Sequence, residues 1–83
     1  MGKNKRAKEM IGIIDRKIVR SNTIRSMGYD VLTRRLEVEF RDKSVYSYFN
    51  VPQFIYERSL TKNSINTYLN KLVYKNYDYK KEK

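Results

Sequence analysis

The sequence predicts an α+β fold: a three-stranded antiparallel β-meander followed by two packed α-helices, in the order β-β-β-α-α, after a basic N-terminal extension. Residues 35–41 alternate between charged and apolar side chains, which is typical of a half-buried strand. Residues 64–77 repeat apolar side chains every three or four positions, which is typical of an amphipathic helix. With 83 residues and no cysteine, the chain can form one small domain with an apolar and aromatic core.

The clearest strand lies at residues 35–41. Its apolar face carries Leu36, Val38 and Phe40, and its polar face carries Arg35, Glu37, Glu39 and Arg41. Residues 21–30 predict the strand before it, which ends at a Gly/Asp turn. Residues 44–51 predict the strand after it, which returns antiparallel.

The length of the turn between the last two strands decides which way Tyr46 and Tyr48 point. A two-residue loop pairs Phe40 with Val45 and leaves both tyrosines outside, where they would form a stacking surface for bases. A three-residue loop shifts the register by one position and turns both tyrosines into the apolar face. That loop needs Lys43 in the left-handed region, at a cost of about 1 kcal/mol. Composition leaves both registers open.

Two helices follow. The first begins at Pro52, whose missing N–H costs nothing at the first helical position, and runs to about Leu60. The side chains expected to be buried on it are Ile55, Tyr56 and Leu60. The second helix is capped by Asn63 or Ser64. Its expected apolar stripe is Ile65, Tyr68, Leu69, Leu72, Val73 and Tyr77. Tyr74 lies on the opposite, polar face.

The net charge of +10 is concentrated at the two ends of the chain. Residues 1–20 carry +5 and residues 61–83 carry +4, whereas residues 21–60 carry +1. The chain thus divides into a basic extension (1–18), a nearly neutral domain (19–78) and a basic tail (79–83) that is expected to fray. Such flanks attract polyanions, of which nucleic acid is the commonest in the cytoplasm; the alternative is that the charge serves solubility.

The best candidate surface for nucleic acid is the polar face of the last helix. There Tyr74 would stack on a base while Lys71 and Lys75 contact phosphates. The remaining candidates are cations of the first hairpin turn and of the two ends, expected to contact phosphates without sequence preference: Arg34, Arg35, Lys3, Lys5, Arg6, Lys8, Lys80, Lys81 and Lys83.

Catalysis has little support in this sequence. The chain has no histidine, no cysteine and no glycine-rich phosphate loop, so we expect a non-enzymatic protein without a cofactor. Glu37 and Glu39 share a strand face, where they are expected to be charge-balanced by arginines rather than to bind a metal. No apolar run approaches the length of a membrane span or of a signal peptide, so a cytoplasmic location is expected. The alternative function is a protein–protein interaction module, as in a phage or mobile-element factor that binds a host protein through its sheet.

Four motifs together resemble the KTSC domain, a small module named from the C-terminus of some lysyl-tRNA synthetases and also found alone in bacteria and phages. They are S-N-x-I-x-S-M-G-Y-D (21–30), L-x-V-x-F (36–40), Y-x-Y-x-x-V-P (46–52) and S-x-N-x-Y-L-N-x-x-V-x-x-x-Y (64–77). The resemblance spans residues 19–77 and implies RNA binding. It also favours Tyr46 and Tyr48 in the core, because the family has polar residues between them. Lys43 and Asn66 stand where the family has glycine.

Overall fold

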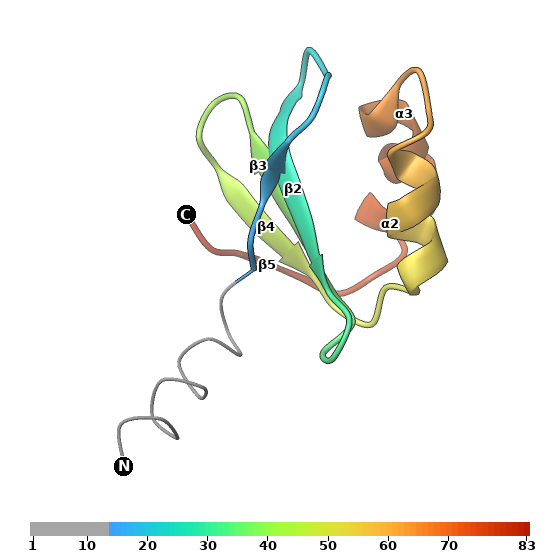
Figure 1. Cartoon of the computed structure of the whole chain (residues 1–83). Coiled ribbons are helices and arrows are strands. Elements are labelled where there is room, and N and C mark those ends of the chain that lie inside the picture. Colours follow the sequence, from blue (N-terminus) through green and yellow to red (C-terminus); the bar gives the residue numbers. More distant parts are fainter. Residues whose placement is uncertain (1–13) are drawn as a thin grey trace.

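The structure is a computed structural model that describes residues 14–83. In these residues a five-stranded antiparallel sheet has its strands side by side in chain order. The strands are β1 (Lys17–Ile18), β2 (Ile24–Asp30), β3 (Arg35–Phe40), β4 (Val45–Tyr48) and β5 (Tyr79–Lys81). Between β4 and β5 come helix α2 (Gln53–Ser59), helix α3 (Ile65–Leu69) and a π-helical turn, η1 (Asn70–Tyr74), that continues α3 directly (Figure 1).

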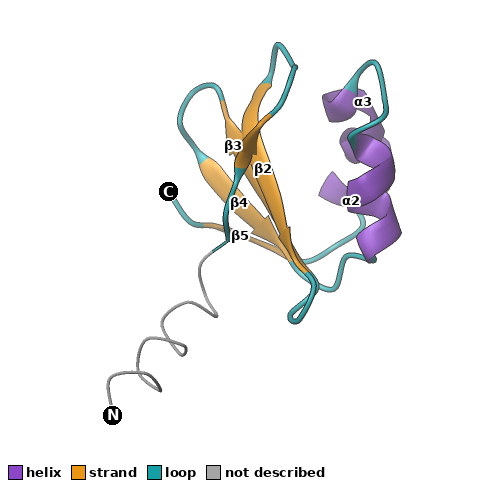
Figure 2. Ribbon diagram, in the orientation of Figure 1, coloured by secondary structure: helices purple, strands orange, loops and turns teal. Residues whose placement is uncertain are grey.

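The helices form a second layer on one face of the sheet (Figure 2). The core lies between the layers and consists of Ile24, Met27, Leu36, Val38, Tyr48, Val51, Ile55, Ile65, Leu69 and Val73. The opposite face of the sheet carries no helix among residues 14–83, and we call it the helix-free face. The α+β class, with an antiparallel sheet and two helices, is therefore confirmed.

The predicted number of three strands is wrong, because one strand is added at each edge of the meander. β1 falls within the predicted N-terminal extension and pairs with β2. β5 falls within the predicted fraying tail and pairs with β4, where Ser47 lies opposite Lys80. The run Tyr-Lys-Lys is too short to show an alternating pattern, so its strand geometry comes from the hydrogen bonds of β4.

The three-residue turn between β3 and β4 is confirmed. Lys43 has a φ of 76°, and the backbone N–H of Phe40 donates to the carbonyl of Ser44 at 2.8 Å. In the resulting register Val38 lies opposite Tyr46. Tyr48 pairs with Leu36 in the same way. Both tyrosines therefore point toward the helices, and the register that would leave them outside does not occur.

The helix starts were predicted well. α2 follows Pro52, and Ser64 caps α3 by accepting a hydrogen bond from the backbone N–H of Thr67 at 3.3 Å. Of the side chains expected to be buried on α2, Ile55 is buried and Tyr56 half-buried. The prediction for Leu60 is wrong: this side chain is 45% exposed at the C-terminal cap of α2.

The second helix departs from α geometry halfway along. In η1 the hydrogen bonds run from residue i to i+5, which adds a residue to the turn and rotates the side chains that follow. Val73 remains buried, but Leu72 is 39% exposed although it belonged to the predicted apolar stripe. Tyr74, predicted on the polar face, instead packs against the core. A strict period of 3.6 residues assigns both side chains to the wrong face.

Candidate nucleic-acid interface

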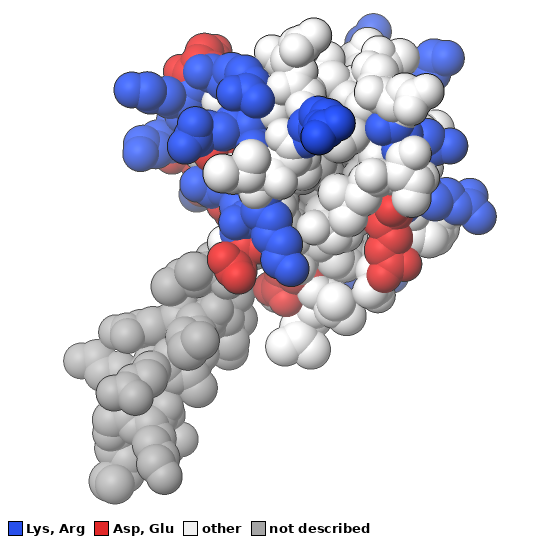
Figure 3. Space-filling view, turned by 45° about the horizontal axis from the view of Figure 1, so that its top comes forward, with Lys and Arg blue, Asp and Glu red and all other residues white. Residues whose placement is uncertain are grey.

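Exposed cations gather where the turn between β3 and β4 meets the C-terminal residues. The backbone N–H of Val45 donates to the carbonyl of Lys83 at 3.0 Å, and that of Glu82 donates to the carbonyl of Val45 at 2.7 Å. These bonds hold the end of the chain beside the turn. The exposed residues of these two segments are Arg41, Lys43, Lys81 and Lys83, which we call the basic rim. The guanidinium of Arg41 also donates to the carbonyl of Ser21 at 3.0 Å, so this side chain extends toward the turn between β1 and β2. Lys and Arg cluster on the corresponding left side of the surface in Figure 3.

The acidic side chains of this region are engaged locally. The carboxylate of Asp42 accepts hydrogen bonds from Ser44, at 2.6 Å from its hydroxyl and 3.0 Å from its backbone N–H. These bonds, with a smaller effect of the charge of Lys81, lower the pKa of Asp42. Glu82 forms an ion pair with Lys80 at 4.0 Å. The basic rim therefore keeps an excess of positive charge.

Five aromatic rings lead from the core to the solvent beside the basic rim. We call them the aromatic row: Phe40, Tyr46, Tyr48, Tyr74 and Tyr79. The rings of Tyr48 and Tyr74 stack with centroids 5.4 Å apart, and Tyr79 lies 5.8 Å from Tyr46 and 6.1 Å from Tyr48. Tyr79 is 60% exposed, whereas Tyr48 is 5% exposed. The row therefore ends in a single exposed ring on the edge strand.

The predicted role of Tyr74 as an exposed stacking residue is wrong. Its hydroxyl donates to Oδ1 of Asn66 at 2.9 Å, and its ring packs against Phe40 and Tyr48. Burial raises the pKa of Tyr74 above that of a free tyrosine. The π-helical turn is the physical reason, because it rotates this side chain toward the sheet. Lys71 and Lys75 are exposed as predicted.

The other candidate residues are dispersed. Arg34 is exposed at the turn between β2 and β3, which lies at the bottom of Figure 1, away from the basic rim. Arg35 is half-buried on the helix-free face. Lys80 points to that same face, since it alternates with Lys81 along β5. Lys3, Lys5, Arg6 and Lys8 lie outside the described residues.

Sequence reasoning missed Tyr79, Arg41 and Lys43 as members of this surface. One signal was available for Tyr79: in the run Tyr-Lys-Lys, a strand places Tyr79 and Lys81 on one face. Nothing local indicates that Arg41 and Lys43 approach the end of the chain, since this depends on β5 pairing with β4.

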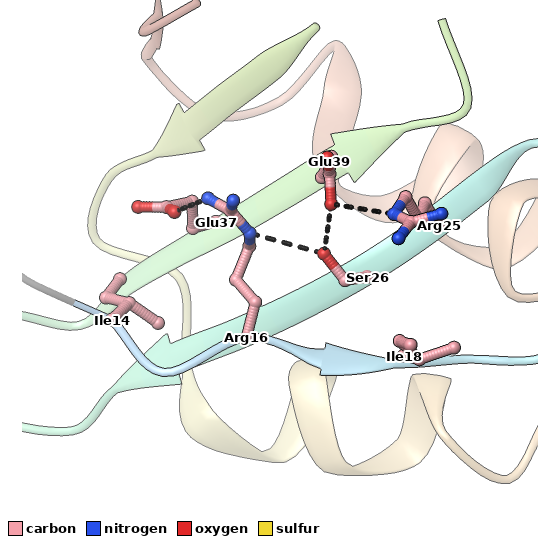
Figure 4. A pocket seen from close by; sticks show the side chains of 7 residues that line it. All are labelled: Ile14, Arg16, Ile18, Arg25, Ser26, Glu37 and Glu39. Atoms are coloured by element: carbon pink, nitrogen blue, oxygen red, sulfur yellow. Dashed lines mark hydrogen bonds and ion pairs between the residues drawn. The ribbon is translucent and has the colours of Figure 1, made fainter. Parts of the chain in front are cut away.

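The helix-free face carries a network of charged side chains around a depression of about 560 Å³ (Figure 4). The guanidinium of Arg16 binds Glu37 and also donates to the hydroxyl of Ser26 at 3.2 Å. That hydroxyl donates to Glu39 at 2.7 Å, and Arg25 lies 3.7 Å from the same carboxylate. The hydrogen bond from Ser26, helped by the nearby arginines, lowers the pKa of Glu39. Glu37 is thus bound by a side chain from the segment before β1, and Glu39 by side chains of β2.

No group of three or more His, Cys, Asp or Glu side chains in residues 14–83 is arranged to hold a metal ion. Over the same residues, no helix has the length and hydropathy needed to cross a bilayer.

Comparison with known proteins agrees with the fold and with the motifs. The sequence model of the KTSC domain matches residues 20–77. The crystal structure of a KTSC domain protein from Yersinia pestis superposes with a TM-score of 0.79 and 28% sequence identity, covering 83% of this chain and 97% of that one. No curated protein matches. The chain therefore belongs to the KTSC domain family.

Proposed function

We propose that this KTSC domain is a non-catalytic module that binds nucleic acid through phosphate contacts, and that the basic rim makes most of them. One observation carries the proposal: β5 and the residues after it bring Lys81 and Lys83 beside the turn that carries Arg41 and Lys43, about 40 residues earlier in the chain. Cations collected from two segments onto one side of a small domain form a field that attracts a polyanion.

The local electrostatics support the same surface. Asp42 is held by Ser44 and Glu82 by Lys80, so neither carboxylate is placed to neutralise all four rim cations. Lys71 and Lys75 add two exposed cations on η1 and just after it. Contacts of this kind supply affinity and orientation rather than base specificity.

The test is fluorescence anisotropy with a labelled RNA hairpin, single-stranded RNA and duplex DNA, each titrated over a series of salt concentrations. The rim variant replaces Arg41, Lys43, Lys81 and Lys83 by Gln. The matched control replaces four exposed cations outside the rim by Gln: Arg20, Arg34, Arg58 and Lys62. Both variants carry the same net charge.

Counterion release predicts that the slope of log K against log salt falls by about 0.7 for each phosphate of a single strand that the protein no longer neutralises. The rim variant should therefore lose about 3 from the slope, and the control less than about 1. Equal losses in the two variants would mean that total charge, and not this surface, drives binding. Absence of binding at 50 mM salt would overturn the proposal.

A second candidate is a protein–protein interaction module. It is favoured by the turn between β2 and β3, where Val31 is 58% exposed and Leu32 is 86% exposed. Two adjacent apolar side chains at the tip of a turn are suited to an apolar pocket on a partner. Two results together would favour this candidate. The unaltered protein would bind none of the nucleic-acid probes, and the Leu32→Ser substitution would abolish binding to a protein partner that the unaltered protein binds.

A further inference from the structure

We infer that Tyr79 stacks on an unpaired base, and that the ligand of this surface is single-stranded nucleic acid. The inference rests on the proposed function, because the basic rim must first hold the phosphates. It goes beyond that function in naming the class of nucleic acid and the residue that recognises it.

The exposure of Tyr79 differs from that of every other ring in the aromatic row. Tyr48 is buried, Tyr74 is half-buried against Phe40 and Tyr48, and Tyr46 is half-buried between Phe40 and Tyr48. Tyr79 contacts Tyr46 and Tyr48 on one side and keeps 60% of its surface accessible. One side of its ring is thus supported by other rings, and the remainder is free for a base.

The position of Tyr79 is fixed by the backbone. Residue 79 lies opposite Tyr48 in the ladder, and the backbone N–H of Phe49 donates to the carbonyl of Asp78 at 2.9 Å. A ring on a paired strand, against other rings, loses little conformational entropy when a base stacks on it. This is the property expected of a stacking platform.

A phosphate contact lies on the same face of the same strand. Side chains alternate along a strand, so Tyr79 and Lys81 point the same way, about 7 Å apart along its axis. Lys81 is exposed and belongs to the basic rim. A strand of nucleic acid that runs along β5 would place a base on Tyr79 and its backbone near Lys81.

The geometry selects single strands because the ring stands on a sheet edge rather than at the tip of a protruding loop. In a duplex the faces of the bases are covered by their neighbours, so a ring supported on one side by Tyr46 cannot reach them. Unpaired bases expose their faces and stack on aromatic side chains without regard to sequence.

The probes that test the inference are a labelled 12-mer of uridine, an abasic spacer strand of equal length and charge, and a duplex. Tyr79→Thr removes the ring but keeps a good strand former, and Tyr79→Phe keeps the ring. Phe54→Ala is the matched control, because Phe54 is 53% exposed on α2 and outside the row.

We expect Tyr79→Thr to weaken binding of the uridine strand about 5- to 150-fold, as loss of one stacked base predicts. Binding of the abasic strand should change less than twofold, and the salt slope should be unchanged. Tyr79→Phe and Phe54→Ala should bind the uridine strand as the unaltered protein does.

Three outcomes would overturn the inference. If Tyr79→Thr weakens the abasic strand as much as the uridine strand, the side chain only supports β5. If Tyr79→Thr binds normally while the rim variant fails, the inference falls and the proposed function stands. If the unaltered protein binds neither strand at 50 mM salt, both fall.

Discussion

Tyr48 is an ionisable side chain enclosed in a small core. It is 5% exposed, and its ring lies among Tyr46, Tyr74 and Tyr79. Burial raises the pKa of Tyr48 from 10.0 to about 12, because the phenolate would lose its hydration there. This position therefore favours the neutral hydroxyl over the phenolate.

Alkaline pH should therefore destabilise the protein partly through Tyr48. The folded pKa is raised, so its contribution is complete below pH 10, where the unfolded chain also keeps the proton, and is lost as the pH rises toward 12. The loss is at most about 1.4 kcal/mol per pH unit. Tyr48→Phe should match the unaltered protein at pH 8 and lose less stability between pH 10 and 12. Urea unfolding at each pH measures the free energy of unfolding of both proteins. An equal loss of stability in both between pH 10 and 12 would contradict the prediction.

Single residues also explain what the sequence could and could not predict about the site. Two registers were open for Tyr46 and Tyr48, and the left-handed conformation of Lys43 decides between them. The choice between a two-residue and a three-residue loop depends on a few neighbouring residues, so the sequence alone defines both registers. The orientation of the Tyr74 side chain toward the sheet could not be predicted, because the spacing of apolar residues does not reveal a π-helical turn.

At the scale of elements, the segment before β1 packs tightly on β2. It passes over β2 at Gly28, where a Cβ atom would stand 2.5 Å from Cγ2 of Ile14 and 2.9 Å from the carbonyl oxygen of Asp15. Glycine at this position lets the segment lie against the helix-free face, where Arg16 reaches Glu37. Glycine here is required by space and not by backbone conformation.

Gly28→Ala should therefore destabilise the fold, by about 1–3 kcal/mol as for other overpacked sites. Ile14→Ala removes the nearest atom but leaves the backbone oxygen of Asp15, so the alanine should cost less in that background without becoming neutral. Thermal unfolding of the two single variants and the double variant measures the coupling free energy between positions 14 and 28. Strict additivity would mean that the segment does not lie over Gly28.

The two edge strands, β1 and β5, are the elements that the sequence did not predict. The meander from Ile24 to Tyr48 follows from alternation and from the turns, because each pattern is long enough to read. β1 and β5 have two and three residues, all exposed. Their extended conformation depends on hydrogen bonds to β2 and β4, and the side chains of these short segments do not predict it.

At the scale of the whole molecule, charge opposes folding. A net charge of +10 on 83 residues repels itself in the compact state more than in the unfolded chain. Part of this charge is concentrated at the basic rim, where the end of the chain lies beside the turn that carries Arg41 and Lys43.

Added salt should therefore raise the melting temperature. Between 0.05 and 0.5 M NaCl the charges are increasingly screened, and each 1 kcal/mol recovered should appear as about 4–8 °C in a domain of this size. The rim variant should melt at a higher temperature in low salt and respond less to added salt. Calorimetry measures both proteins. An equal response would show that the rim adds nothing to the repulsion.

The strand order has a consequence for how the edge of the sheet is formed. β1 to β4 join through short turns, but β5 reaches β4 only after the chain has passed through α2, α3 and η1, which separates Tyr48 from Tyr79 by 31 positions. Val73 is buried in the core and Tyr74 stacks on Tyr48, so the chain is anchored to the sheet at η1, and the three exposed residues of β5 add few contacts of their own. Opening of β5 should therefore cost less than opening of the meander, and it would uncover Tyr46 and Tyr48. A ligand that contacts β5 favours the closed form, so binding should stabilise the pairing of β5 with β4.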